Sequence, residues 1–319
     1  MNRAKWLTVF IVIMLVALLF ASGCGQGENA AEEPAADNGD SQGNDQGNDG
    51  QEVSLMIAGS DSEVNLVTRL AEEYMNINDG VSIAVTGGGS GVGITSLIDG
   101  DIDIANSSRP MKDEEVEALK ANRGEDVYAV RFAVDGVAVI VNENNPVSEL
   151  TVEQIGAIYR GEITDWSEVG GEDREITIYG RQSTSGTYVF FMEKVVQGDY
   201  SPEMRNLAGN SDIVEAVKSD PGAIGYCAIG YATGEGMRPL LVSADSASPA
   251  FDPTVLENVT SGDYPLTRPL YQYVAGKPAG TILDFFIFET GDEGQAIVLE
   301  EGFYPITAAD VEFNRDVLQ

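Results

Sequence analysis

The chain has 319 residues, of which 18 are Lys or Arg and 52 are Asp or Glu, so its formal net charge is −34, and it contains no histidine. Such a charge excludes the basic surface that nucleic-acid binding needs, and the lack of histidine excludes Ser-His-Asp catalysis and histidine-based zinc sites. With only two cysteines, Cys24 and Cys227, a structural cysteine cluster is excluded as well.

The start of the chain has the pattern of an exported lipoprotein. Arg3 and Lys5 supply positive charge, the run 9–20 is apolar but too short for a comfortable membrane span, and small residues precede Cys24. This arrangement resembles a bacterial lipobox. We expect residues 1–23 to be a signal peptide and Cys24 to carry the lipid; an uncleaved anchor helix with an incidental cysteine is the alternative.

Residues 24–52 are predicted to form a disordered acidic tether. From residue 25 they carry eight acids, no base and no large apolar side chain, so they cannot bury enough surface to offset chain entropy. Residues 53–319 still hold 44 acids and 16 bases, a net charge of −28. The folded part is therefore acidic too. Dissolved salt would screen the repulsion among these acidic side chains, so the charge indicates a salt-rich habitat. An acidic protein from an ordinary habitat is the alternative.

From residue 53 onward, predicted strands alternate with predicted helices. This alternation favours α/β layers around a mostly parallel sheet. The apolar run 131–142 is too long for an average strand and is predicted to cross from one lobe to another. The other predicted strands are 53–58, 81–86, 102–105, 175–179, 223–229 and 270–274, and the predicted helices are 63–75, 92–98, one beginning near 113, 151–159, 188–196, 213–219 and 279–288.

Polar turns with Ser or Thr close to Gly precede three of these helices. They contain Ser60 and Ser62, then Ser90, then the run 185–187. A helix N-terminus exposes unpaired N–H groups and partial positive charge, hydroxyls add donors, and Gly lets an anion come close. Each turn alone favours simple helix capping. All three turns lie at the carboxyl ends of strands, where ligands of open α/β sheets bind. Arg181 adds a charged guanidinium that can donate two hydrogen bonds to an anion. Together these features predict a site for a small tetrahedral oxyanion.

At these turns the sequence resembles the phosphate-binding proteins that feed the bacterial ABC phosphate importer. The resemblance implies an α/β, two-lobed periplasmic-binding-protein fold of type II, in which each lobe is a sheet flanked by helices and two segments cross between lobes. Lobe 1 would comprise residues 53–133 and 236–319, and lobe 2 residues 134–235. The matching segments are 59–62, 89–93, 103–109, Arg181 with 185–187, 221–226 and 264–271.

The resemblance also implies a function. The protein would be a monomeric extracytoplasmic receptor, lipid-anchored through Cys24, that binds inorganic phosphate and delivers it to an ABC permease, with no catalytic activity, cofactor or metal. Alternatives are a receptor for sulfate, molybdate or arsenate, a phosphate-ester hydrolase, or an adhesion or sensory protein that keeps the fold. The implied phosphate contacts are Ser60, Asp61, Ser62, Ser90, Ser108, Arg109, Arg181, Ser185, Gly186 and Thr187.

Two of these positions carry open alternatives. Arg109 stands where some family members have a carboxylate that accepts the proton of hydrogen phosphate, and it either reaches the anion or braces its loop. Asp61 stands where the family commonly has Thr or Ser. It either takes over the acceptor role, which would exclude unprotonated sulfate, or caps the following helix and points to solvent.

The other polar segments do not match known ligand-binding motifs. The run 87–93 lacks the Lys-Ser or Lys-Thr of a nucleotide-binding loop, and the acid-rich stretches 99–103 and 113–117 do not match a calcium loop. Cys227 lies in an apolar strand and is expected to be a small buried side chain.

Overall fold

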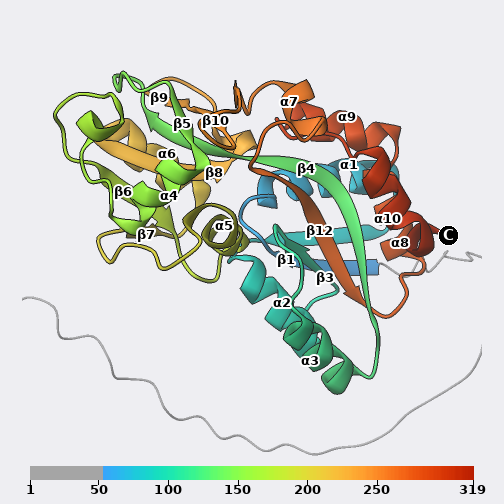
Figure 1. The fold of residues 1–319 in the computed structure, drawn as a ribbon. Coiled ribbons are helices and arrows are strands. Elements are labelled where there is room, and N and C mark those ends of the chain that lie inside the picture. The colour runs from blue at the N-terminus through green and yellow to red at the C-terminus, as the bar shows by residue number, and fades with distance from the viewer. Residues whose placement is uncertain (1–52) are drawn as a thin grey trace, which may run out of the picture. The chain divides into compact units, whose positions relative to one another are not determined.

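The computed structural model describes residues 53–319, which belong to one compact unit. The predicted signal peptide, the tether and Cys24 lie outside the described residues. Within the described part most helices and strands alternate as expected, and the α/β class is confirmed (Figure 1). The expectation of a mostly parallel sheet is wrong, because the strands at 127–142 and 267–275 pair antiparallel with their neighbours.

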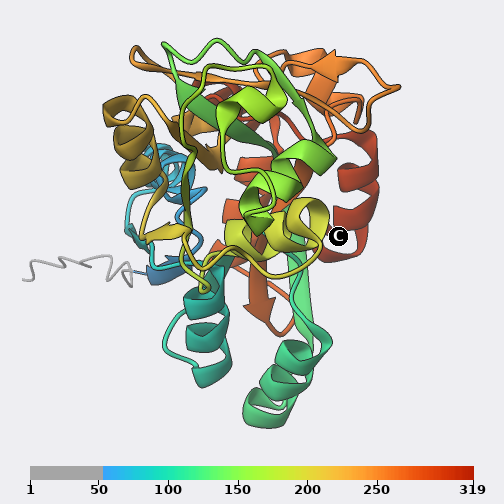
Figure 2. The same ribbon diagram turned by 60° about the vertical axis from the view of Figure 1, so that its left-hand side comes forward.

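The first part of the chain forms three parallel strands with helices between them. β1 pairs with β2 on one side and with β3 on the other. α1 buries an apolar stripe that includes Leu66, Leu70 and Tyr74. α2 and α3 lie side by side at one end of the molecule, away from α4 and α6 (Figures 1 and 2). The bounds are β1 (Val53–Gly59), α1 (Val64–Ile77), β2 (Val81–Thr86), α2 (Ser90–Asp99), β3 (Ile104–Ser107) and α3 (Asp113–Arg123).

A single long strand, β4 (Val127–Asn142), joins the two halves of the sheet. Up to Gly136 it pairs antiparallel with β12 (Thr267–Ala275), and from Val137 it pairs antiparallel with β8 (Ala223–Ala228). The whole sheet therefore runs β2-β1-β3-β12-β4-β8-β6-β7, with β9 also beside β4. This change of partner falls within the run 131–142, whose role as a crossing between lobes stays a prediction.

The second half of the sheet carries its own helices. β6 pairs parallel with both β7 and β8, and α6 packs on β8. α5 continues without a break into a π-helical turn. The bounds are β5 (Glu149–Thr151), α4 (Val152–Arg160), a 3-10 turn (Trp166–Val169), β6 (Thr177–Arg181), α5 (Gly186–Phe191), the π-helical turn (Met192–Val196), β7 (Arg205–Leu207), α6 (Asn210–Ser219) and a 3-10 turn (Ile229–Tyr231).

The last part of the chain returns to the first half of the sheet. β9 still pairs with the end of β4, and β10 pairs with β5, so these short strands adjoin elements of the expected second lobe. The expected boundary at residue 236 stays a prediction, and these pairings favour a second crossover farther along the chain. The bounds are β9 (Met237–Pro239), β10 (Leu241–Ser243), β11 (Ala250–Phe251), α7 (Leu256–Thr260), α8 (Thr281–Thr290), α9 (Asp292–Glu300) and α10 (Ala308–Leu318).

None of the helices between residues 53 and 319 is both long and apolar enough to cross a bilayer.

Candidate functional site

Hydroxyl groups from three turns meet beyond the ends of β1, β2 and β3. The Ser60 hydroxyl donates to Ser108 Oγ at 3.1 Å, and the Ser108 backbone N–H donates to Ser90 Oγ at 3.1 Å. All three side chains are buried. Two of the three turns that were predicted to converge, those of Ser60 and Ser90, therefore lie together, and the turn of Ser108 joins them.

The start of α5 closes this cluster from the other half. Ser62 Oγ and Thr187 Oγ1 share a hydrogen bond of 2.7 Å, and the Gly91 N–H donates to the Thr184 carbonyl at 3.0 Å. A Cβ atom on Gly186 would lie 2.3 Å from Ser90 Oγ, so only glycine allows this approach without a shift. The two walls of the site are thus in direct contact.

Ser185 serves its own helix at the same place. Its Oγ accepts the backbone N–H groups of Thr187 at 3.2 Å and Tyr188 at 3.4 Å, as an N-cap does. The hydroxyl hydrogen is still available to donate. Capping and anion binding are therefore compatible for this residue.

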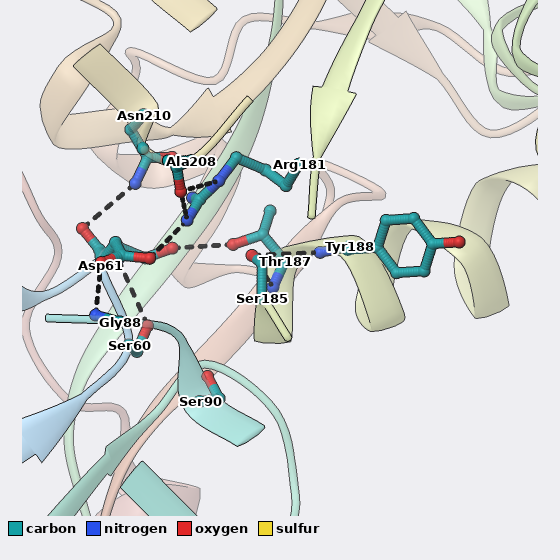
Figure 3. Close-up of polar contacts among 12 residues, drawn as sticks. Ser60, Asp61, Gly88, Ser90, Arg181, Ser185, Thr187, Tyr188, Ala208 and Asn210 are labelled. Carbon is teal, nitrogen blue, oxygen red and sulfur yellow. Dashed lines mark hydrogen bonds and ion pairs between the residues drawn. The ribbon is translucent and has the colours of Figure 1, made fainter. Parts of the chain in front are cut away.

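Arg181 is the last residue of β6 and is only 1% exposed. Its Nη2 donates to Asp61 Oδ2 at 2.6 Å and to the Ala208 carbonyl at 2.8 Å (Figure 3). Burial lowers the pKa of Arg181, and the Asp61 carboxylate opposes that shift. Its Nη1 is buried and has no hydrogen-bond partner within residues 53–319. A buried donor left unpaired costs about 1–3 kcal/mol, so this nitrogen is available to bind an anion.

Asp61 joins the two halves of the molecule. Besides the Arg181 pair, its Oδ1 accepts the Gly88 N–H at 2.8 Å, and its backbone carbonyl accepts from Asn210 at 3.1 Å (Figure 3). The Tyr231 hydroxyl donates to the same carbonyl at 3.0 Å. The N-cap position of α1 is Glu63, and its side chain makes no capping hydrogen bond. The alternative in which Asp61 caps this helix and points to solvent is therefore wrong, while its role as acceptor for a ligand proton stays a prediction.

Arg109 is turned toward α3. Its Nη1 and Nη2 donate to the two Glu115 oxygens at 2.8 and 2.6 Å, and Nη1 also donates to the Pro110 carbonyl at 2.8 Å. Together with backbone contacts, these bonds lower the pKa of the Glu115 carboxyl, although its partial burial works in the opposite direction. Of the two alternatives, the structure shows the loop brace, and no described contact joins the Arg109 guanidinium to the hydroxyl cluster.

A second guanidinium at the site was missed by the sequence analysis. Arg268 on β12 lies opposite Asp135 on β4, and its Nη2 donates to Asp135 Oδ2 at 2.7 Å. The same nitrogen reaches Thr187 Oγ1 at 3.0 Å and Ser62 Oγ at 3.3 Å, and both ionic side chains are buried. The available signal was a single Arg and a single Asp, each inside a largely apolar strand.

Comparison with known proteins identifies the family. Residues 29–293 match the model of the PBP superfamily domain. The chain is 32% identical over 280 residues to the phosphate-binding protein PstS of Pseudomonas aeruginosa, covering 82% of this chain and 86% of that protein. It is 31% identical over 264 residues to PstS of Bacillus subtilis, covering 82% of this chain and 83% of that protein. The chain belongs to the PstS family of phosphate-binding proteins.

Solved structures agree with this assignment. A phosphate ABC transporter substrate-binding protein from Clostridium perfringens, crystallised with bound phosphate, superposes with a TM-score of 0.71 at 31% identity, covering 80% of this chain and all of that chain. An ABC-type phosphate transport receptor from Vibrio cholerae gives 0.65 at 28% identity, covering 79% of this chain and all of that chain. The predicted resemblance and the PBP-like α/β fold class of this PstS-family protein are thus confirmed.

The burial of Cys227 and the grouping of metal-ligating side chains remain to be described. Cys227 is fully buried in β8, as predicted, and burial raises the pKa of its thiol. No group of three or more His, Cys, Asp or Glu side chains gathers as a metal site between residues 53 and 319.

Proposed function

We propose that this PstS-family protein binds inorganic phosphate between its two halves and delivers it to an ABC permease. The observation that carries the proposal is the buried Arg181 guanidinium, whose Nη1 has no hydrogen-bond partner among residues 53–319. The same guanidinium bonds Asp61, the residue between the buried hydroxyls of Ser60 and Ser62. Relatives named as phosphate-binding proteins, and a similar chain crystallised with phosphate, support the choice of ligand.

The binding groups that we propose are mostly neutral donors. Asp61 already balances Arg181, and Asp135 already balances Arg268, so the two ion pairs contribute no net charge. The anion would be held by hydroxyls, backbone N–H groups and the spare guanidinium donor, in a site from which water is excluded when the lobes close. The proposed ligand set is Ser60, Ser62, Ser90, Ser108, Arg181, Ser185, Gly186 and Thr187, with Arg268 holding Ser62 and Thr187 in place.

Asp61 is the proposed source of selectivity for a protonated oxyanion. Its carboxylate lies against the guanidinium that would meet the ligand. A carboxylate repels a fully ionised anion but can accept a proton from hydrogen phosphate, and sulfate carries no such proton near neutral pH. The mechanism needs no covalent chemistry, and the relatives are named as binding proteins rather than enzymes.

The test is calorimetric titration of the protein with phosphate, sulfate, molybdate and arsenate. We expect phosphate to bind more tightly than sulfate and molybdate, with arsenate, its chemical analogue, as the strongest competitor. Tighter binding of sulfate or molybdate than of phosphate would contradict the proposal and identify that oxyanion as the ligand. Turnover of a chromogenic phosphate ester would instead support the hydrolase alternative.

We also propose that the protein is extracytoplasmic and anchored through lipid on Cys24, as a monomer. The charged, apolar and small-residue pattern before Cys24 supports this location. Cys24→Ala is expected to move the protein from the membrane fraction to the soluble secreted fraction. Unchanged membrane association of this variant would favour the uncleaved anchor helix.

A further inference from the structure

Two carboxylic side chains are buried directly behind the first binding turn. Glu63 precedes α1, Glu289 lies in α8, and both are 0% exposed. Both carboxyl oxygens of Glu63 and the Oε2 atom of Glu289 have no hydrogen-bond partner in the described part of the chain. Buried acids are normally paired or hydrogen-bonded, so this arrangement requires an explanation.

The charged groups facing Glu63 do not form a counter-ion for it. They are Arg268 from β12, Asp135 from β4 and Glu289 from α8. Arg268 directs its Nε and Nη2 to Asp135, at 3.0 and 2.7 Å, and makes no hydrogen bond to Glu63 among the described contacts. Burial raises the pKa of Glu63 well above its usual range. Arg268 and the nearby Ser60 hydroxyl oppose this shift, and the carboxyls of Asp135 and Glu289 reinforce it.

Within residues 53–319, the only hydrogen-bond partner of the Glu289 carboxyl is an amide. The Gln272 Nε2 donates to Glu289 Oε1 and to Asn106 Oδ1, both at 3.2 Å. Burial raises the pKa of Glu289 well above its usual range, and the Gln272 hydrogen bond opposes the shift only in part. A neutral acid paired with an amide is far cheaper to bury than a carboxylate without a cation.

This polar group is connected to the binding turns. The Ser60 N–H donates to the Asn106 carbonyl at 3.0 Å, and Asn106 accepts from Gln272 through its side chain. Ser62, the residue before Glu63, shares a hydrogen bond with Arg268. A change of charge at Glu63 or Glu289 therefore acts at short range on the wall that holds the hydroxyl cluster.

We propose that Glu63 and Glu289 are held as neutral carboxylic acids behind the first binding turn, and that loss of their protons sets the upper pH limit of anion binding. The inference rests on the proposed function. Since Asp61 and Asp135 already balance the two guanidinium groups, ionisation of either acid adds net negative charge behind the first binding turn. An ionised Glu63 also draws Arg268 away from Ser62 and Thr187. Both acids are positioning residues and do not themselves contact the anion.

The direction of the pH effect follows from the linkage between proton binding and folding. A carboxyl whose pKa is higher in the folded than in the unfolded protein holds more protons in the folded state between those two values. Stability therefore falls as pH rises from the unfolded to the folded pKa. Anion affinity is full while the acids are protonated, and it falls as pH rises through their folded pKa values.

The experiment compares the parent protein with Glu63→Gln, Glu289→Gln and the double variant. Glutamine keeps the shape but cannot ionise. The dissociation constant for inorganic phosphate is measured by calorimetry from about pH 5.5 to about pH 9.5, a window that includes strongly raised carboxyl pKa values. Phosphate titrates in this window too, but its own titration cancels in the ratio of the parent constant to the variant constant at each pH.

We expect this ratio to stay near one at the acidic end and to rise by about 10-fold at the alkaline end, the change expected for one pKa unit of coupling. Glu72→Gln, on the exposed face of α1, is the matched control and should leave the ratio flat. Parallel pH profiles for the parent and the double variant would overturn the inference. So would a parent affinity that follows sodium concentration at constant pH, because the oxygens would then hold a cation rather than protons.

A second measurement needs no phosphate and no double variant. Ligand-free unfolding of the parent should lose stability as pH rises across the window, and Glu289→Gln should lose less; equal slopes would again overturn the inference. If the parent binds no phosphate at any pH but these slopes differ, the proposed function is wrong, while the inference that Glu63 and Glu289 are neutral is retained.

Discussion

The two buried Arg–Asp pairs of the site are built in different ways. Arg268 and Asp135 lie opposite each other on adjacent strands, and they are 3% and 0% exposed. Arg181 and Asp61 come from the end of β6 and from the turn after β1, and they are 1% and 22% exposed. The first pair is part of the sheet, whereas the second joins two halves of the molecule.

The comparison separates a structural role from a functional one. A pair inside the sheet keeps its geometry when lobes move, so it can act as a fixed wall of the site. A pair across the two halves has to break when the lobes separate, and it therefore contributes to the balance between open and closed forms. Four substitutions test this distinction.

The largest effect is expected for Arg268→Met. Removing this guanidinium leaves the fully buried Asp135 without its partner, which typically costs about 3–5 kcal/mol of unfolding free energy. Urea denaturation measures the loss. The double variant Arg268→Met with Asp135→Leu should recover most of it, because no unpaired charge is left. A single variant as stable as the parent would show that the sheet pair is not a structural element.

Arg181→Met is expected to act mainly on binding. A hydrogen bond to a charged group contributes about 1.5–3 kcal/mol, so the dissociation constant for phosphate should rise by roughly 10- to 150-fold. Its cost in stability should be smaller than that of Arg268→Met, because Asp61 is partly exposed and regains water. Arg174→Met, at an exposed position, is the control. Equal losses of stability for both site arginines would remove the distinction between the pairs.

Gly186→Ala tests the contact between the halves directly. The added methyl group would lie 2.3 Å from Ser90 Oγ and 2.6 Å from Ser108 Oγ, so the closed form must shift. Overpacking typically costs about 1–3 kcal/mol, which corresponds to roughly 5- to 150-fold weaker phosphate binding. The open form should be unaffected, and small-angle scattering with phosphate should show less closure than in the parent. Gly198→Ala, where a Cβ makes only ordinary contacts, should bind like the parent; an equal effect of both substitutions would contradict the prediction.

The smallest effect is expected for Asp61→Asn. Loss of the carboxylate removes both the bridge to Arg181 and the repulsion of unprotonated anions. The preference for phosphate over sulfate should narrow by about 10-fold, or about 1.4 kcal/mol, in parallel titrations. Asp199→Asn, at an exposed position, should leave the preference unchanged. A variant that rejects sulfate as strongly as the parent does would exclude Asp61 as the selective group.

Local patterns were enough to predict much of the fold and part of the site. β2 spans the residues expected for it, and α3 begins at Asp113, because strand alternation and acidic helix starts depend on neighbours in the chain. Boundaries were less accurate where polar residues end a strand. β3 was expected at 102–105 and lies at Ile104–Ser107, since pairing with β1 and β12 extends it toward Ser108.

The turns that carry the hydroxyls, the glycines and Arg181 could be predicted from the sequence, because each of these features is a short-range pattern at the end of a strand. The three-dimensional fold was needed to show that Arg268 faces Asp135 from 133 residues away, and that Glu63 is enclosed with no hydrogen-bond partner among residues 53–319. The physical reason is that pairing and burial of charged groups depend on strand register and on how helices cover the sheet. Both are set by contacts among residues distant in the chain.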